Sequence, residues 1–150
     1  MLTVIQRVTQ AKVVVDGNTI GEIQQGIVAL LAIEKGDGER EAKQLIERVL
    51  NYRIFADEND KMNLSLRDIS GGLLLIPQFT LAADTKKGNR PSFTAAAAPS
   101  IASALFDFAT HYAKQHHNHI ASGQFAANMQ VSLCNDGPVT FTLTSNNRSA

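Results

Sequence analysis

A run of apolar residues at positions 27–33, opened by Gly26, constrains the fold of this chain more than any other feature. Apolar side chains at every position, without polar alternation, are typical of a strand that is buried on both faces. Such a strand lies inside a sheet whose faces are covered. The run is also far shorter than the roughly 20 residues needed to span a bilayer, so no contact with a membrane is expected.

Further segments of the chain have strand patterns and predict a mostly β core. The predicted strands, besides the apolar run, are residues 3–8, 12–15, 19–23, 52–55, 73–81, 129–134 and 139–143. Pro77 interrupts the fifth of these. Residues 135–138 (Asn-Asp-Gly-Pro) favour a hairpin turn between the last two. The alternative is a rigid backbone element that presents carbonyl groups to a substrate.

Two segments have the spacing of amphipathic helices. The first, which Asp37 can cap, carries an apolar stripe of Ala42, Leu45, Ile46, Val49 and Leu50. The second begins near Pro99 and carries Ile101, Ala104, Leu105, Phe108, Ala109 and Tyr112. We therefore predict an α+β fold, a layered β/β/α sandwich with a mixed β-sheet core and two main helices covering one face. The domain spans residues 1–144, and residues 145–150 form a polar, flexible tail.

Charge and cysteine content narrow the class of protein. A chain of 150 residues is long enough for one domain that needs no disulfide or metal to stabilise it. It has 14 basic and 14 acidic side chains and one cysteine, Cys134. Zero formal net charge argues against non-specific coating of nucleic acid, but leaves open a local contact with one end of a structured RNA. A lone thiol fits a reducing compartment, and no signal peptide is indicated, so we expect a cytoplasmic protein.

Metal and nucleotide sites have little support in the sequence. Four histidines lie near the end of the second predicted helix: His111, His116, His117 and His119. A solvated helix C-terminus explains them better than a metal site, because no carboxylate falls at ligand spacing. Residues 57–60 lack the Gly and Glu of a calcium loop and form a polar turn. The motifs of zinc proteases, P-loop enzymes, α/β-hydrolases and dinucleotide enzymes are absent, and we expect no metal and no cofactor.

Residues 78–81 (Gln-Phe-Thr-Leu) are the strongest candidate site. A polar pair lies there in an apolar strand, directly after a proline that has no N–H group. This break frees backbone N–H groups near Phe79 and Thr80 to point at a ligand. Thr80 is either a nucleophile or a buried threonine bonded to its neighbours. The basic patch at residues 86–91 is either a solvated loop or a segment that steers a phosphate backbone toward this site.

Seven segments, taken in order, resemble the D-aminoacyl-tRNA deacylase family, also called D-tyrosyl-tRNA deacylase. They are residues 5–8 (Ile-Gln-Arg-Val), 51–55 (Asn-Tyr-Arg-Ile-Phe), 61–64 (Lys-Met-Asn-Leu), 78–84 (Gln-Phe-Thr-Leu-Ala-Ala-Asp), 90–93 (Arg-Pro-Ser-Phe), 125–131 (Phe-Ala-Ala-Asn-Met-Gln-Val) and 135–140 (Asn-Asp-Gly-Pro-Val-Thr). The resemblance runs from residue 1 to about Leu143. Two positions depart from the family pattern, since Pro77 stands where the family commonly has serine and Gln124 where it often has arginine.

The resemblance implies a homodimer with two sites at the subunit interface. Each site combines the segment Gln78, Phe79 and Thr80 of one chain with Gly137 and Pro138 of the other. In the family this Gly-Pro bond is cis, and its carbonyl groups hold the α-amino group of the substrate. The backbone wall excludes L side chains and accepts D side chains or glycine.

The remaining implied roles concern the substrate's surroundings and the reaction. Arg7 resembles the arginine that orients the Gly-Pro turn, and Phe125, Met129 and Gln130 resemble residues around the terminal adenosine of tRNA. Backbone N–H groups of Phe79 and Thr80 stabilise the oxyanion. The implied activity is hydrolysis of D-aminoacyl-tRNA, and of glycyl-tRNA, in translation quality control. The alternatives are an RNA-binding module without turnover and a hydrolase of small D-amino-acid esters with Thr80 as nucleophile.

Overall fold

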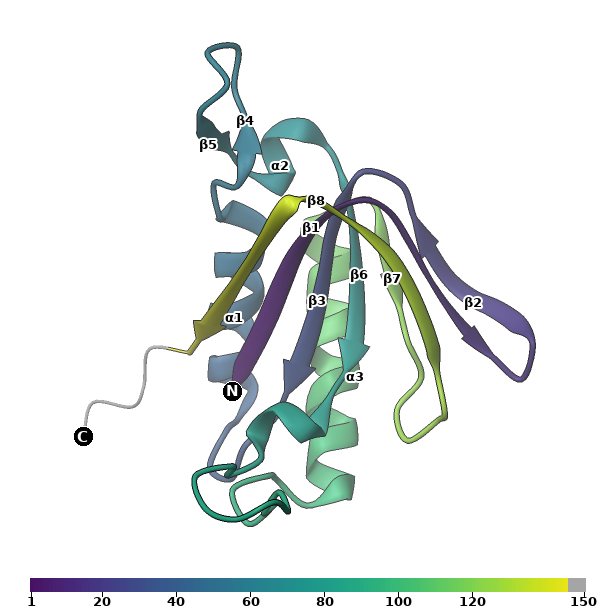
Figure 1. Ribbon diagram of the computed structural model, residues 1–150, viewed down its shortest axis with the longest axis vertical. Coiled ribbons are helices and arrows are strands. Elements are labelled where there is room, and N and C mark those ends of the chain that lie inside the picture. The colour runs from purple at the N-terminus through teal and green to yellow at the C-terminus, as the bar shows by residue number, and fades with distance from the viewer. Residues whose placement is uncertain (146–150) are drawn as a thin grey trace.

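The computed structural model describes residues 1–145, which form a six-stranded mixed sheet with helices on one side and a small two-stranded sheet of β4 and β5 (Figure 1). The strands are β1 (Leu2–Val15), β2 (Asn18–Ile23), β3 (Gly26–Ala32), β4 (Phe55–Ala56), β5 (Met62–Leu64), β6 (Gly72–Pro77), β7 (Ile120–Ser122) and β8 (Gln130–Thr144). The helices are α1 (Glu39–Asn51), α2 (Leu66–Ile69), the 3-10 helix η1 (Phe79–Ala82) and α3 (Pro99–His116). Within these residues, no helix is both long and apolar enough to cross a membrane.

β1 is the strand around which the sheet is organised. Its first half pairs with β3 and its second half with β2, while β8 runs antiparallel along nearly its whole length. β6 and β7 extend the sheet beyond β3 through parallel pairing. The prediction of two separate strands at residues 3–8 and 12–15 is wrong. Thr9 and Gln10 are exposed and interrupt the apolar pattern, but pairing with β8 keeps the backbone extended across them.

Two apolar clusters confirm the predicted α+β sandwich. The larger one lies between the sheet and the helices α1 and α3, which cover the same face (Figure 1). The smaller one lies on the other face, where the sheet curls and encloses side chains such as Val13, Val28 and Leu74. β2 and β7 lie close together on this face, since a Cβ atom added at Gly21 would lie 3.0 Å from the Ser122 carbonyl oxygen. The fold therefore has a β layer, a second β layer and a helical layer.

The first helix follows its predicted stripe, but its cap differs. All five predicted core residues of α1 are buried. The N-cap is Gly38, whose N–H donates to the Glu41 carboxylate at 2.8 Å. The Asp37 carboxylate instead accepts from the Glu34 N–H at 2.8 Å and lies 2.6 Å from the Met1 amino group. The prediction that Asp37 caps the helix is therefore wrong, because a closer buried cation holds its carboxylate.

The buried stripe of α3 is rotated from the predicted one. Ile101 is 53% exposed and Ala104 is exposed as well, whereas Ala102 and Phe106 are buried. Spacing alone allowed either choice, and the large Phe106 ring decides which face packs on the sheet. Among the shorter elements, the predicted strand at residues 52–55 contributes only Phe55 to β4.

The structure describes only the first residue of the predicted tail. Ser145 is buried, and its N–H donates to the Met1 carbonyl oxygen at 3.0 Å. The rest of the predicted tail, residues 146–150, lies outside the described residues.

Candidate functional site

The chain leaves the sheet directly after Pro77. β6 pairs with β3 up to the match of Leu31 with Pro77, and the next N–H, of Gln78, still donates to the Leu31 carbonyl oxygen at 2.8 Å. Residues Phe79–Ala82 then form η1. The prediction that the strand continues to residue 81 is therefore wrong. Since β3 itself ends one residue after Leu31, no ladder remains for residues 79–81 to join.

The start of η1 directs two backbone donors away from the helix. Its first internal hydrogen bond runs from the Leu81 N–H to the Gln78 carbonyl oxygen at 3.2 Å. The N–H groups of Phe79 and Thr80 precede this bond, so they have no acceptor within the helix. The sequence prediction of free N–H groups at these two positions therefore has a geometric basis, although a 3-10 helix and not a strand provides it.

Phe79 and Thr80 are exposed and Gln78 is half-buried, and the polar side chains of the segment contact each other. The Gln78 amide nitrogen lies 2.5 Å from the Thr80 hydroxyl oxygen and donates to it. The Phe79 ring is 55% exposed and packs at a tilt on Phe93, with ring centroids 5.1 Å apart. Within residues 1–145, no hydrogen bond joins the Thr80 hydroxyl to a histidine, lysine or carboxylate. Thr80 is exposed, so the alternative of a buried threonine is wrong, although its hydroxyl is bonded to a neighbour as that alternative also expected.

An apolar cavity of about 450 Å³ opens beside these residues. Six of its lining residues are Pro77, Gln78, Phe79, Ala97, Phe125 and Met129. Phe125 and Met129 come from the loop after β7, which is fixed to β6 by the bond from the Gly123 N–H to the Leu75 carbonyl oxygen at 2.8 Å. The fold thus joins Gln78 and Phe79 with two of the three predicted adenosine contacts. Gln130 is exposed at the start of β8 and is not part of this lining.

The Gly137-Pro138 segment lies within β8 and not in a hairpin turn. β8 pairs with β1 on both sides of this segment, and the register shifts there, so the extra residues form a bulge. The hairpin prediction is therefore wrong. The Gly137–Pro138 peptide bond is cis, as the family resemblance implies, and Gly137 has φ of +134°. An added Cβ at Gly137 would lie 2.8 Å from a Val139 methyl group, which favours glycine at this position.

Arg7 fixes the bulge from the neighbouring strand. Its Nε donates to the Asp136 carbonyl oxygen at 3.0 Å, and its Nη1 donates to the Ile54 carbonyl oxygen at 2.8 Å. On the other side, the Asn135 side-chain oxygen accepts from the Val139 N–H at 2.7 Å. Charge-assisted bonds to main-chain oxygens restrict the backbone more than neutral ones. Arg7 therefore has the orienting contact that the resemblance implies.

Within one chain, the bulge and η1 lie at opposite ends of the sheet. Arg7 is matched with Ile27 on β3, whereas Thr3 is matched with Leu31, which anchors Gln78. Four residues of strand separate these matches, a distance of about 13 Å at 3.3 Å per residue. Figure 1 shows the bend of β8 at the upper end of the main sheet and the turn after β6 near the bottom of the molecule. A single chain therefore does not bring the predicted site residues together.

The other polar candidates have structural partners. The His116 ring stacks on Tyr112 with centroids 4.1 Å apart, and a ring nitrogen of His117 lies 2.6 Å from the Gly71 carbonyl oxygen. In the described part of the chain, no group of three or more His, Cys, Asp or Glu residues could hold a metal ion. The Asp57 carboxylate accepts N–H groups of Lys61 and Asn59, and the bond from Lys61, foremost, lowers the pKa of Asp57. These contacts fit the predicted polar turn.

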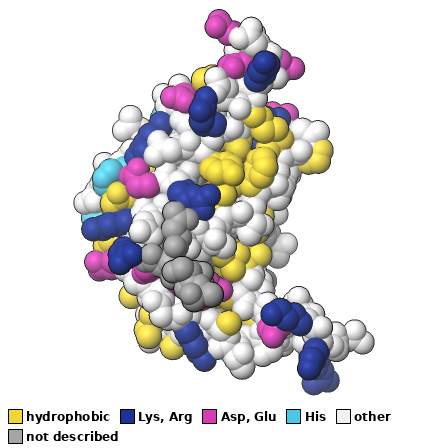
Figure 2. Space-filling view, turned by 90° about the vertical axis from the view of Figure 1, so that its left-hand side faces the viewer, with side chains coloured by type: hydrophobic (Ala, Val, Ile, Leu, Met, Phe, Trp, Pro, Cys, Tyr) yellow, Lys and Arg dark blue, Asp and Glu magenta, His cyan; other side chains and the backbone are white. Residues whose placement is uncertain are grey.

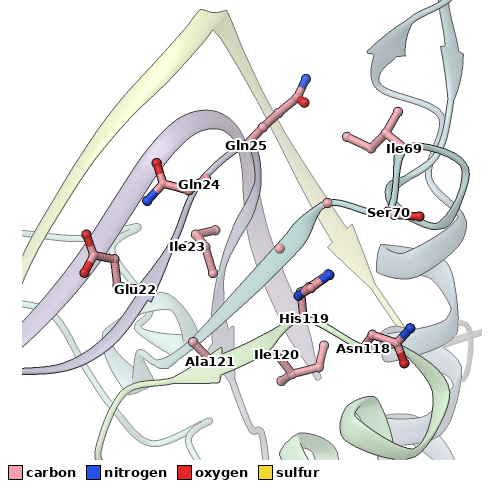
Figure 3. Close-up of a pocket in the computed structure, with 12 residues that line it drawn as sticks. Glu22, Ile23, Gln24, Gln25, Ile69, Ser70, Asn118, His119, Ile120 and Ala121 are labelled. Carbon is pink, nitrogen blue, oxygen red and sulfur yellow. The ribbon is translucent and has the colours of Figure 1, made fainter.

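A second cavity, of about 600 Å³, lies away from this site between the ends of β2, α2 and β7 (Figure 3). Its polar lining includes Glu22, Gln25, Asn118 and His119. Figure 3 shows Glu22 and His119 on different sides of the cavity, with Gln25 pointing away from both. An acid and a base that do not converge cannot act on one bond, so this cavity is a weaker candidate for a reaction.

Comparisons with known proteins agree on one family. The model of the family described as D-Tyr-tRNA(Tyr) deacylase matches residues 4–144. A D-aminoacyl-tRNA deacylase of Janthinobacterium sp. (strain Marseille) is 56% identical over 95% of this chain and 96% of its own length. The D-aminoacyl-tRNA deacylase of Pseudoalteromonas translucida (strain TAC 125) is 57% identical over 95% of this chain and 99% of its own length.

Two solved structures share the fold. The c-Myc DNA unwinding element binding protein is 37% identical, with a TM-score of 0.92 over 97% of this chain and 99% of that one. A probable eukaryotic D-amino acid tRNA deacylase is 15% identical, with a TM-score of 0.82 over 95% of this chain and 97% of that one. The second likeness concerns the fold alone.

Proposed function

The chain belongs to the D-Tyr-tRNA(Tyr) deacylase family and is a D-aminoacyl-tRNA deacylase, and on this premise we propose that the cavity beside η1 is where it hydrolyses its substrate. The ester bond of D-aminoacyl-tRNA is cleaved, and a free D-amino acid and tRNA are released. One observation supports this assignment. The N–H groups of Phe79 and Thr80 have no acceptor within η1, whose first hydrogen bond is donated by Leu81, and Phe79 lines an apolar cavity of about 450 Å³.

The two N–H groups stabilise the charge that develops during hydrolysis. When water attacks the ester carbonyl carbon, its oxygen becomes an oxyanion, and backbone donors in fixed positions stabilise this charge. The ribose 2′-hydroxyl of the terminal adenosine assists the attack. The ester C–O bond then breaks, and the 3′ oxygen takes up a proton. Because an aminoacyl ester is already activated, this reaction needs no cofactor.

Thr80 positions the substrate in this proposal and is not the nucleophile. Its hydroxyl oxygen accepts a hydrogen bond from the Gln78 amide at 2.5 Å, and within residues 1–145 no hydrogen bond joins it to a base that could remove its proton. The Gln78–Thr80 contact holds the Thr80 side chain against Gln78, which lines the cavity. The three residues thus act together: Phe79 and Thr80 contribute backbone N–H groups, and Gln78 and Thr80 contribute side chains.

The apolar cavity takes the terminal adenosine. Phe125 and Met129 line it, and an aromatic ring and a thioether are suitable surfaces for a purine base. The contact of Gln130 with the nucleoside rests on the family resemblance alone. The partner is therefore the acceptor end of an aminoacyl-tRNA.

A second copy of the chain completes each site. Since η1 and the Gly137-Pro138 bulge lie at opposite ends of one chain, a homodimer supplies the bulge to the η1 pocket of its partner. β8 supports this arrangement, because it is a strand of 15 residues whose outer edge is free within the described chain. Its apolar residues Val131 and Phe141 are 38% and 37% exposed. Edge strands of this length usually pair or are protected.

Chirality follows from the backbone wall of the bulge. With the α-amino group held by the carbonyl groups of Gly137 and Pro138, an L side chain would meet main-chain atoms, whereas a D side chain points outward. Glycine has no side chain to reject, so glycyl-tRNA is also cleaved. Rejection by clash needs no pocket for a particular side chain, so many D-amino acids are accepted. In the cytoplasm, this activity serves translation quality control.

The test compares release of D-tyrosine, L-tyrosine and glycine from their charged tRNAs, with a chelator present throughout. The proposal expects rapid release of D-tyrosine and glycine and no release of L-tyrosine. Equal cleavage of both enantiomers would refute the role of Gly137 and Pro138. Loss of D-tyrosine release in chelator, restored by a metal ion, would refute a cofactor-free reaction.

A further inference from the structure

We propose that the loop of residues 84–92, here called the basic loop, binds phosphate groups of the tRNA acceptor end and holds it over the η1 pocket. The loop carries Lys86, Lys87 and Arg90 and a single carboxylate, Asp84. This inference rests on the proposed function, since it assumes that the terminal adenosine occupies the cavity. It assigns a second contact surface on the substrate, outside the reacting ester.

The base of the basic loop is rigid and adjoins the pocket. Asp84 and Ser92 form a β-bridge in which each N–H donates to the other's carbonyl oxygen, at 2.7 and 3.0 Å. The next residue, Phe93, packs on Phe79 of η1. A nucleic-acid strand that leaves the cavity past Phe79 therefore passes the loop at once. The two exposed rings continue the apolar cavity toward the basic side chains.

The conformation of the loop directs its cations into solvent. The Lys86 N–H donates to the Asp84 carboxylate at 2.9 Å, and Gly88 turns the chain with φ of +66°. All residues of the loop are exposed. Figure 2 shows Lys and Arg side chains at the lower end of the molecule, where Figure 1 places this loop.

The three cations are available to a ligand. The salt bridges found within residues 1–145 involve Met1, Arg7 and Arg67 as cations, and none involves the loop. On a chain of zero formal net charge, three cations within nine residues form a local field that attracts phosphate. A mononucleoside in the cavity would not reach them. A polynucleotide would.

The reach of the loop matches a short stretch of nucleic acid. From the Asp84–Ser92 bridge to the tip near Gly88 are four residues, which extend over at most about 13 Å. A reach of this size is enough to bring the loop's cations to more than one phosphate of the same strand. The contacts therefore fall on the nucleotides just before the terminal adenosine and carry no sequence information.

The experiment compares two substrates, one that has the phosphate backbone of tRNA and one that lacks it. These are D-tyrosyl-tRNA and D-tyrosine esterified to the 3′ oxygen of adenosine. The double variant Lys86→Ala/Lys87→Ala is expected to lose about tenfold in kcat/KM on the tRNA and nothing on the adenosine ester. Its slope of log kcat/KM against log salt becomes shallower by about 1.4 to 1.8, which is 0.7 to 0.9 per lost cation. The variant Lys86→Arg/Lys87→Arg keeps the wild-type slope.

Lys43→Glu is the matched control. It changes the net charge by the same amount and is exposed on α1, which contributes no residue to the η1 cavity or to the Gly137-Pro138 bulge. The inference expects wild-type kinetics for it on both substrates. An unchanged kcat/KM of the double variant on tRNA would overturn the inference, as would equal losses on both substrates. Because wild-type hydrolysis of the adenosine ester tests the proposed function by itself, the two failures are distinguishable.

Discussion

Replacing Phe79 by proline isolates the backbone donor on which the proposed reaction depends. Phe79 is the first residue of η1, a position that tolerates proline because the N–H there has no partner within the helix. Gln78 before it has φ of −142° and ψ of +75°, outside the α region that a following proline disfavours. The substitution therefore removes the N–H while leaving the fold's own hydrogen bonds intact. Phe79→Ala is the matched control, since it removes the same ring and keeps the N–H.

The expected loss follows from the number of donors. In the proposed site two N–H groups face the oxyanion, and removal of one oxyanion donor costs about 10² to 10³ in kcat, or roughly 2.7–4 kcal/mol. Single-turnover release of D-tyrosine from D-tyrosyl-tRNA measures this loss in Phe79→Pro relative to Phe79→Ala. Chemical unfolding of the two variants should give free energies within about 0.5 kcal/mol of each other. Rates that agree within about threefold would refute the backbone mechanism.

Three further substitutions test other parts of the site and fold. Arg7→Ala removes two bonds to main-chain carbonyl groups and should lower the free energy of unfolding by about 3 kcal/mol; it should also reduce the D-over-L ratio of kcat/KM, which a purely structural arginine would leave unchanged. Thr80→Ala should cost less than about tenfold in kcat, whereas loss of a nucleophile would cost about 10³ or more. The guanidinium of Arg67, bonded to Glu47, holds the pKa of Glu47 below its ordinary 4.5, and the Tyr112 hydroxyl adds to this. The stabilisation by the ionised Glu47 is complete above that ordinary value and is lost as the pH falls through the lowered pKa. Glu47→Gln should therefore weaken the dependence of the urea unfolding midpoint on pH between about pH 6 and pH 3, and an unchanged pH dependence would contradict this.

The helices and the apolar run were predictable because their signals are local. In α1, five apolar residues at helical spacing correspond to five buried residues. The run at residues 27–33 lies mostly in β3, between β1 and β6. In α3, the same spacing rule fits two adjacent faces, and only packing of Phe106 against the sheet distinguishes them.

The pairing of β8 was not predictable from local chemistry. Residues 135–138 have the composition of a turn, and the same residue types also form a bulge. The choice between them depends on β1, which lies more than a hundred residues earlier and pairs with β8 on both sides of the bulge. No signal in residues 135–138 themselves reports this distant partner.

The site was predictable in chemistry more than in shape. Pro77 correctly indicated where backbone donors become free, but the 3-10 turn after it depends on where β3 ends. The small residues of the cavity wall, Ala96 and Ala97, were missed. Their signal was the alanine run at residues 95–98, which leaves room for a ligand between larger neighbours.

The central claim is that each site joins η1 of one chain to Gly137 and Pro138 of its partner, and mixing two inactive variants tests it most directly. Phe79→Pro disables the η1 contribution, and Gly137→Ala forces a side chain into a position with φ of +134°. After the two chains are unfolded together and refolded, half of the dimers are mixed, and one of the two sites in each is intact. The account predicts about a quarter of the wild-type rate of D-tyrosine release. No recovery, with mixed dimers detected by native mass spectrometry, would contradict it.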